Sequence, residues 1–303
     1  MHVKLTTFAA VVLACTLCAG LAACGGDDGP DPDAHTNPKP GAPRFTGEGV
    51  PGTLYLAVGP TDLDADLYRV RGPMASARRL TTGARISIIG ASEAGVAVSY
   101  APDGPDRVAA LDLGGGPVLP GRQIDSFGHA PSASRDGRVA YSRPRYDDDG
   151  DVVGSRVYVA RLDGRAKRVA YSAKQELTVS WTPRGELAVA RSGGRRIIVD
   201  PNGPRRRVIE PGLQEIYTFD ANAGGDMWVA GRGAGSEAVA IVGGDGGRRT
   251  FKTSWIPADW SPDGRWILVV TQRRLGLMSP VHGHVHEVGR VRGGVLANTE
   301  YVR

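Results

Sequence analysis

A short motif recurs along most of the chain and constrains the fold more than any other feature. In its clearest copy, residues 259–270 read DWSPDGRWILVV, so that a polar turn precedes an apolar strand. Four further segments align with it on a shared glycine, and the five glycines are Gly95, Gly137, Gly185, Gly225 and Gly264. Three positions before each glycine lies a small polar side chain: Ser92, Ser134, Thr182, Asn222 or Ser261. Such side chains hydrogen-bond turn backbones, so the motif predicts a hairpin rather than a reactive loop.

The spacing of the motif predicts the architecture. The glycines stand 39 to 48 residues apart, and Pro51-Gly52 begins a sixth copy. A period near 40 residues composed only of strands is typical of one four-stranded β-propeller blade per repeat. The first copy has no strand ahead of Gly52, whereas the chain ends in an unused strand at 295–301. We therefore expect an all-β, six-bladed propeller over residues 46–303, closed by the C-terminal strand, which removes unpaired sheet edges.

The repeat also resembles a known family. Ser-Pro-Asp-Gly, a strand, Asp-Gly and a basic-apolar strand are similar to the TolB-type, WD-like propeller repeat, and the resemblance covers roughly residues 50–303. It implies six blades but says little about chemistry, because one fold hosts many functions. Trp181 and Trp260 share one repeat position, and we expect both to pack between blades.

The first residues resemble a bacterial lipoprotein signal. Lys4 precedes a short apolar run, and Leu21-Ala22-Ala23-Cys24 follows. We predict that residues 1–23 are a signal peptide, too short in its apolar part to span a bilayer, and that Cys24 is acylated with palmitate or a similar chain. The alternative is an ordinary secretory signal in which Cys24 is incidental. Residues 24–45 are rich in Pro, Gly and Asp and predict a flexible tether.

These features predict a location and a class of partner. We expect an extracytoplasmic monomer, anchored by lipid to the outer face of the cell membrane, that binds an envelope protein or peptide. The formal net charge is +5. Outside the cytoplasm this small excess favours weak attraction to anionic lipid or wall polymer, the alternative being that 37 basic against 32 acidic residues carry no functional meaning, and we expect no nucleic acid partner. Cys24 is the only cysteine after the signal, which excludes disulfides and cysteine metal sites from the mature chain.

Candidate binding residues lie before the repeated strands, where propeller loops converge on the channel mouth. Nine or ten positions before the repeat glycines stand Arg85, Phe127, Glu176, Glu215 and Trp255, and His129 lies close to Phe127. This mixture of charged and aromatic side chains predicts a surface for a peptide or polar ligand. The alternative is that these residues merely line a water-filled channel.

One acidic loop is a candidate metal site. Asp147, Asp149 and Asp151 alternate in the longest loop of the third repeat, and oxygen-rich clusters suit calcium. The segment lacks the twelve-residue loop with a terminal Glu of an EF-hand, and a solvated acidic loop is the alternative. His284 and His286 could share one face of a strand, but no cysteine lies nearby in sequence, and surface histidines are favoured over a zinc site. We expect no cofactor, with calcium as the alternative.

The sequence has no nucleophile elbow, no His-Glu-x-x-His helix pattern and no Ser-x-x-Lys pairing attached to other active-site elements, so we assign no catalytic residue and predict a non-catalytic binding module. The alternative is an extracytoplasmic hydrolase or lyase that uses Glu176 and Glu215 as acid and base, with or without calcium. A third reading is an accessory subunit of a transporter or sensor kinase.

Overall fold

The computed structural model describes residues 43–62, 64–100, 107–111, 123–191, 196–203, 206–209, 219–222, 224–225, 227–231, 238–243 and 247–302. Within these ranges the regular structure is almost entirely β-strand, with one short 3₁₀ helix, η1 (Met74–Ser76). No helix in the described ranges has the length and apolar character that crossing a membrane requires. The all-β class predicted from the sequence is confirmed.

The described strands form six antiparallel sheets. From its innermost strand outward, sheet 1 contains β25 (Val295–Tyr301), β2 (Val50–Gly59), β3 (Asp66–Gly72) and β4 (Arg78–Arg79). In the same order, sheet 2 contains β5 (Ile86–Ser92), β6 (Gly95–Tyr100), β7 (Arg107–Leu111) and β8 (Gln123–Asp125). Sheet 3 contains β9 (His129–Ala133), β10 (Arg138–Tyr146), β11 (Val152–Arg161) and β12 (Arg168–Ala173).

The remaining three sheets follow the same order along the chain. Sheet 4 contains β13 (Leu177–Trp181), β14 (Leu187–Arg191), β15 (Arg196–Val199) and β16 (Arg206–Ile209). Sheet 5 contains β17 (Phe219–Ala221), β18 (Met227–Gly231), β19 (Ala238–Gly243) and β20 (Arg248–Lys252). Sheet 6 contains β21 (Ile256–Trp260), β22 (Ile267–Val270), β23 (Arg274–Met278), β24 (Val285–Arg292) and, on its outer edge, β1 (Arg44–Thr46).

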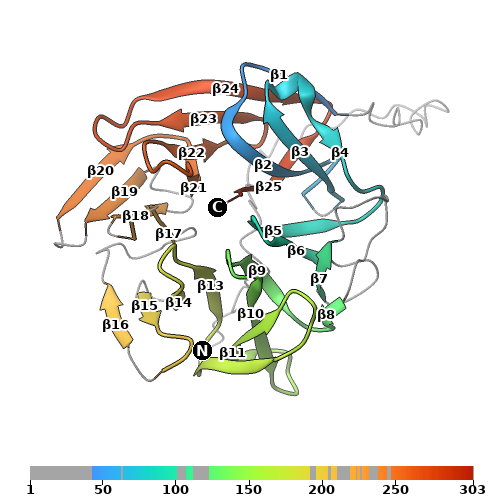
Figure 1. Ribbon diagram of the computed structural model, residues 1–303, viewed down its shortest axis with the longest axis vertical. Coiled ribbons are helices and arrows are strands. Elements are labelled where there is room, and N and C mark those ends of the chain that lie inside the picture. Colours follow the sequence, from blue (N-terminus) through green and yellow to red (C-terminus); the bar gives the residue numbers. More distant parts are fainter. Residues whose placement is uncertain are drawn as a thin grey trace, which may run out of the picture.

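The sheets stand side by side around a common centre (Figure 1), and β25, β5, β9, β13, β17 and β21 lie nearest to it. Contacts join β25 to β5, β5 to β9, β9 to β13, β17 to β21 and β21 to β25. Each sheet therefore turns its two faces toward neighbouring sheets, and both faces can bury apolar side chains.

The repeated turns have the geometry that the sequence predicts. The N–H of Gly264 donates to the carbonyl oxygen of Ser261 at 2.8 Å, and Gly185 makes the same bond to Thr182 at 2.9 Å. Gly264 has a φ of +69° and Gly185 a φ of +75°, a backbone region that favours glycine. The Ser261 hydroxyl also accepts the N–H of Trp266 at 3.0 Å. The motif residues are therefore requirements of the hairpin.

The core consists of apolar layers between the sheets. Between sheets 5 and 6, Trp260 packs with Val239 and Ile267, and only 1% of its surface is exposed. Trp181 is buried among apolar residues of sheets 3 and 4, including Val157. The expected packing of both tryptophans between sheets is confirmed.

Hydrogen bonds also join successive innermost strands near the core. The backbone N–H of Tyr301 in β25 donates to the Asp259 carboxylate of β21 at 2.7 Å. The N–H of Trp181 in β13 donates to the Ser132 hydroxyl of β9 at 2.9 Å. The donors and acceptors of both bonds are buried. Each bond therefore pairs polar groups that would be costly to leave without a partner.

The C-terminal strand lies in the same sheet as the first repeat. β25 pairs antiparallel with β2 in a register that places Tyr301 opposite Leu54 and Val295 opposite Gly59. Leu296 and Tyr301 are buried in the same apolar layer as Leu54. The first repeat thus obtains its innermost strand from the other end of the chain.

The N-terminal strand begins earlier than the sequence suggests. β1 pairs with β24, and the Phe45 ring lies 4.9 Å from the Tyr68 ring between their centroids. Arg44 and Phe45 belong to this strand, whereas the composition of the chain places them in the tether. Backbone pairing and the aromatic contact outweigh the Pro- and Gly-rich composition at this boundary.

Candidate functional site

Antiparallel order gives every sheet two different ends. The links between first and second strands and between third and fourth strands lie at one end, the turn end, which includes 134–138, 182–186 and 261–266. The links between second and third strands and the connections to the next innermost strand lie at the opposite end, the mouth end. It includes 126–128, 147–151, 174–176 and 253–255. Of the predicted binding residues, those that precede innermost strands in the described ranges therefore fall at the mouth end: Arg85, Phe127, Glu176 and Trp255.

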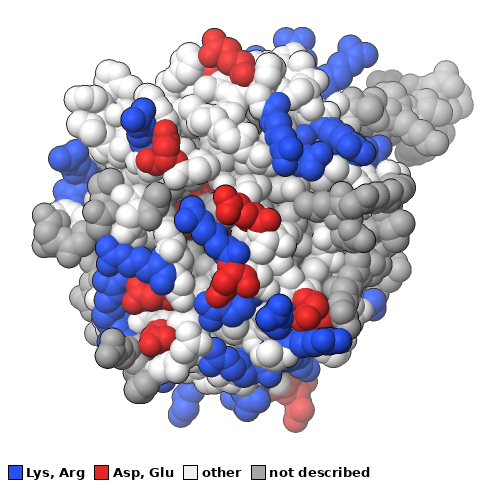
Figure 2. All heavy atoms as spheres, viewed as in Figure 1, with Lys and Arg blue, Asp and Glu red and all other residues white. Residues whose placement is uncertain are grey.

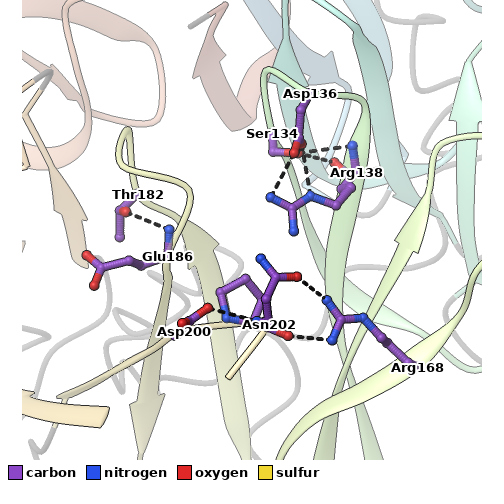
Figure 3. Close-up of polar contacts among 9 residues, drawn as sticks. Ser134, Asp136, Arg138, Arg168, Thr182, Glu186, Asp200 and Asn202 are labelled. Carbon is purple, nitrogen blue, oxygen red and sulfur yellow. Dashed lines mark hydrogen bonds and ion pairs between the residues drawn. The ribbon is translucent and has the colours of Figure 1, made fainter. Parts of the chain in front are cut away.

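Polar groups at the turn end bind one another across neighbouring sheets (Figure 3). Arg168 of sheet 3 donates to the side-chain oxygen of Asn202 in sheet 4 at 2.7 Å. Arg138 forms an ion pair with Asp136 at 2.8 Å, and its guanidinium carbon lies 4.4 Å from the centroid of the Trp181 ring. The contacts of Arg168 with Asn202 and of Arg138 with Trp181 join sheet 3 to sheet 4, so the turn end has a structural role.

Phe127 is an exposed aromatic side chain at the mouth end. It lies between β8 and β9, and 52% of its surface is exposed. The guanidinium carbon of Arg143 lies 5.2 Å from the centroid of its ring, within the range of a cation–π contact. An exposed ring held beside a cation offers both apolar area and charge to a partner.

A buried carboxylate fixes the loop that carries Phe127. Asp125 accepts the Phe127 N–H at 3.0 Å and the Tyr141 hydroxyl at 2.9 Å, and it forms an ion pair with Lys167. The Lys167 ammonium also lies 4.9 Å from the centroid of the Tyr158 ring. Burial alone would raise the pKa of Asp125, but the three hydrogen bonds outweigh it and lower the pKa below its ordinary value. Asp125 thus clamps sheet 2 to sheet 3.

Trp255 supplies a second aromatic side chain at the mouth end. It is half-buried against the apolar layer around Trp260, and the backbone N–H of Trp255 donates to the Thr253 hydroxyl at 3.2 Å. The guanidinium carbon of Arg274 lies 5.0 Å from the centroid of the Trp255 ring. The structure therefore repeats the aromatic–arginine pairing on sheet 6.

Arg85 and Glu176 occupy the corresponding loops before β5 and β13. Arg85 is exposed, has a φ of +52° and forms an ion pair with Asp64 at 3.3 Å. Glu176 is half-buried, directly before Leu177. Both side chains belong to the mouth end, as the sequence predicts, but no bond joins either one to Phe127 or Trp255 within the described ranges.

Three further predictions from the sequence fall outside the described side chains. Cys24 and Glu215 lie outside the described residues, and His129 is described only as a backbone position of β9. Their roles stay predictions.

The acidic loop is ordered by its own backbone. The Asp147 carboxylate accepts the N–H of Asp151 at 2.8 Å and that of Asp149 at 3.2 Å. All three side chains are exposed. No three His, Cys, Asp or Glu side chains in the described part of the chain are grouped as metal ligands. Calcium at this loop stays a prediction.

Three carboxyl groups of the innermost strands were not predicted as site residues from the sequence. Asp220, Asp259 and Glu300 lie on β17, β21 and β25. Burial raises the pKa of Glu300 well above its ordinary value, and the nearby Asp220 carboxylate raises it further. Asp220 and Asp259 each stand two positions before a repeat turn, a signal that could have found them. Glu300 does not precede a repeat turn, so its position relative to the repeat does not predict it.

Charge on the face viewed in Figure 2 is mixed. Lys and Arg side chains are interspersed with Asp and Glu over this face, without a continuous area of one sign. Attraction of an anionic partner to this face must therefore come from local groups rather than from a broad field.

Comparison with known proteins identifies the fold. The sequence matches no protein-family model and no curated protein. TolB from Acinetobacter baumannii is 17% identical with a TM-score of 0.57, over 82% of this chain and 67% of that chain. A putative TolB from Agrobacterium tumefaciens is 14% identical with a TM-score of 0.55, over 84% of this chain and 100% of that chain.

A further propeller domain is similar as well. The β-propeller domain of Cps50 (Swd1) from Myceliophteria thermophila is 12% identical with a TM-score of 0.53, over 83% of this chain and 89% of that chain. At these identities the likeness concerns the fold alone. The chain therefore has the all-β fold of TolB-type β-propellers, built from repeated four-stranded antiparallel sheets.

Proposed function

We propose that the six sheets are the blades of one closed propeller, held at the outer face of the cell membrane by lipidated Cys24. In this proposal the mouth end binds an envelope protein or peptide, and the protein is not a catalyst. The observation that carries the proposal is Phe127, an exposed ring held beside Arg143 on a loop that the buried Asp125 fixes.

Closure is supported by contacts between the last and first repeats. β25 pairs with β2 along most of its length, and its Tyr301 N–H also donates to Asp259 of sheet 6. A C-terminal strand that contacts both neighbours can complete a ring and leave no open inner edge.

Binding at the mouth end is supported by the residue types that stand there. Aromatic and arginine side chains dominate the energetics of protein interfaces, and Phe127 with Arg143 and Trp255 with Arg274 supply two such pairs. Binding costs less entropy when the contact residues are held in place, as the Asp125 clamp holds the Phe127 loop.

Lipid anchorage follows from the predicted signal. Two or more acyl chains give stable membrane attachment, because each buried methylene contributes about 0.8 kcal/mol. Replacing Cys24→Ala should move the protein from the membrane fraction to the soluble fraction. If the variant stays in the membrane fraction at the level of the parent protein, lipid anchorage through Cys24 is contradicted.

A catalytic alternative is favoured by one observation. A carboxyl group of raised pKa beside a second carboxylate suits general acid–base chemistry, and Glu300 and Asp220 provide that arrangement. Hydrolysis of a panel of esters, lactones and glycosides by the purified protein, lost in Glu300→Gln, would favour this alternative.

The binding proposal is tested by crosslinking in the source cell envelope, followed by purification of the full-length protein. The Phe127→Ser variant should capture at least tenfold less of the partner than the parent protein. Val281→Ser is the matched control, because Val281 is similarly exposed, at 56%, but lies at the turn end. Equal loss in both variants, or no captured partner with the parent protein, would contradict the proposal.

A further inference from the structure

A basic cavity lies on the outer three strands of sheet 3 at the mouth end. Its volume is about 280 Å³, and it is lined by Arg145, Ser155, Arg156, Ser172, Ala173 and Lys174. β10 and β11, with 9 and 10 residues, are among the longest strands described, and their mouth-end half forms two walls of the cavity. The start of the loop after β12 completes it.

Strand register places four of the polar side chains that line the cavity on one face of the sheet. Arg145 pairs with Gly154 and Arg156 pairs with Ser172, and these two rows are two residues apart along β11. Side chains two residues apart on a strand share a face. Lys174 stands two residues after Ser172, so its side chain lies on the same face of the sheet as that of Ser172. Three cations and one hydroxyl group therefore converge.

A glycine makes room for one of these cations. A Cβ on Gly154 would lie 2.7 Å from the carbonyl oxygen of Ala173 and 3.2 Å from Nη2 of Arg145. The bare backbone at this position lets the Arg145 guanidinium lie against the sheet, where its N–H groups border the cavity.

Within the part of the chain that the structure describes, no carboxylate lies within ion-pair distance of the cations that line the cavity. Among the described residues, Arg145, Arg156 and Lys174 form no ion pair, whereas Arg138, Arg207 and Arg290 each have a carboxylate partner. The acidic loop is close in sequence, but the Asp147 carboxylate is turned to its own backbone. Convergent cations repel one another and are stabilised when an anion lies between them.

We propose that this cavity binds the phosphate group of a phosphate ester. Two guanidinium groups can each form paired N–H···O bonds with phosphate oxygens, and the Lys174 ammonium and Ser172 hydroxyl can bind the remaining oxygens. A phosphate ester carries more charge than a carboxylate, which suits three cations. The volume exceeds what one phosphate needs, so part of the attached group would also enter the cavity. The site does not depend on the protein partner proposed for Phe127.

Binding of inorganic phosphate and of glycerol 3-phosphate to the full-length protein, measured by calorimetry at two salt concentrations, tests the site. The Arg145→Gln/Arg156→Gln variant should bind at least tenfold more weakly. The control is Arg161→Gln/Arg265→Gln, which removes the same charge from exposed turn-end residues. The control should bind as the parent protein does, and both variants should melt at the parent temperature.

Vesicles of phosphatidylcholine with or without phosphatidic acid distinguish a lipid headgroup from a soluble ester. Binding that depends on phosphatidic acid and on Arg145 and Arg156, with weak binding of glycerol 3-phosphate, assigns the phosphate to a lipid. Tight binding of glycerol 3-phosphate assigns it to a soluble ester. The proposal is wrong if none of the three probes binds saturably, or if the control pair of substitutions weakens binding as much as the cavity pair.

Discussion

The turn end and the mouth end of the sheets are stabilised in different ways. At the turn end, one hydrogen-bonded motif recurs, as at Ser261 and Gly264, and side chains such as Arg168 bind the neighbouring sheet. At the mouth end, the loops differ in sequence, and the exposed Phe127 ring and the half-buried Trp255 ring each lie beside an arginine. The comparison teaches that the repeat in the sequence marks where the fold must be the same, whereas the residues proposed to bind a partner lie in loops whose sequence can vary.

Removal of the last strand should have the largest effect, because it tests whether the ring is closed. Deletion of residues 295–303 removes the pairing of β25 with β2 and the buried side chains of Leu296 and Tyr301. Burial of one large apolar side chain contributes about 1.5–3 kcal/mol, so we expect a fall in Tm of at least roughly 10 °C. Calorimetry of the truncated protein measures it, and an unchanged Tm would contradict closure.

Loss of a core tryptophan should be the next largest effect. Trp260→Ala creates a cavity between sheets 5 and 6 and should lower the free energy of unfolding by about 3–5 kcal/mol. Trp266 stands in the same repeat and is 37% exposed, so Trp266→Ala should cost less than about 1 kcal/mol. Urea unfolding of both variants provides the comparison, and equal losses would mean that Trp260 is not the packing residue.

The Asp125 clamp should affect stability in a pH-dependent way. The Asp125→Asn variant should lose about 1–3 kcal/mol at neutral pH, because it weakens the bonds to Lys167 and Tyr141. The pKa of Asp125 is lowered in the folded protein, so its contribution is present above the unfolded-state pKa, near 3.9, and is lost as pH falls through the folded pKa. Variant and parent should therefore converge in acid. If the difference in free energy of unfolding between variant and parent is the same at all pH values, the ionised Asp125 carboxylate is not the source of the stabilisation.

Glu300 should show the opposite sign and a smaller effect. Its pKa is raised in the folded protein, so the stability it contributes is present below the unfolded-state pKa, near 4.3, and is lost as pH rises through the folded pKa. Glu300→Gln should raise Tm at neutral pH by roughly 2–4 °C and have little effect below the unfolded-state pKa. Thermal melts across this range check the sign, and a lower Tm at neutral pH would show that the carboxylate is stabilising.

Replacement of the exposed ring should have the smallest effect on folding. Phe127→Ser should change the free energy of unfolding by less than about 0.5 kcal/mol, because the side chain is exposed and its backbone bond to Asp125 is kept. Chemical unfolding measures this change. A loss above about 2 kcal/mol would place Phe127 in the structural framework instead of the binding surface.

Much of the fold could be predicted because it repeats. The turn glycines and the two tryptophans recur at fixed offsets, and backbone sterics and burial impose the same residue types in each copy. The boundary at Arg44 could not be predicted in the same way, because the pairing of β1 with β24 joins segments far apart in the sequence.

The candidate site was less predictable. The position of Phe127 before β9 could be counted from the repeat, but its partner Arg143 and the clamp through Asp125 depend on contacts between sheets. The basic cavity depends on the register of β10, β11 and β12, which places Arg145 and Arg156 on the same face of the sheet, in rows two residues apart. Sequence alone does not specify that register, since a one-residue shift would turn the side chains to the other face.

The most direct test of the functional difference between the two ends is site-specific photocrosslinking in the source cell envelope. A photoreactive amino acid is introduced at position 127 of the mouth end or, in a separate protein, at position 281 of the turn end. We expect a discrete crosslinked product from position 127 that decreases when an excess of unlabelled protein is added, and none from position 281. The same product from both positions, or a product from position 281 alone, would contradict the assignment of binding to the mouth end.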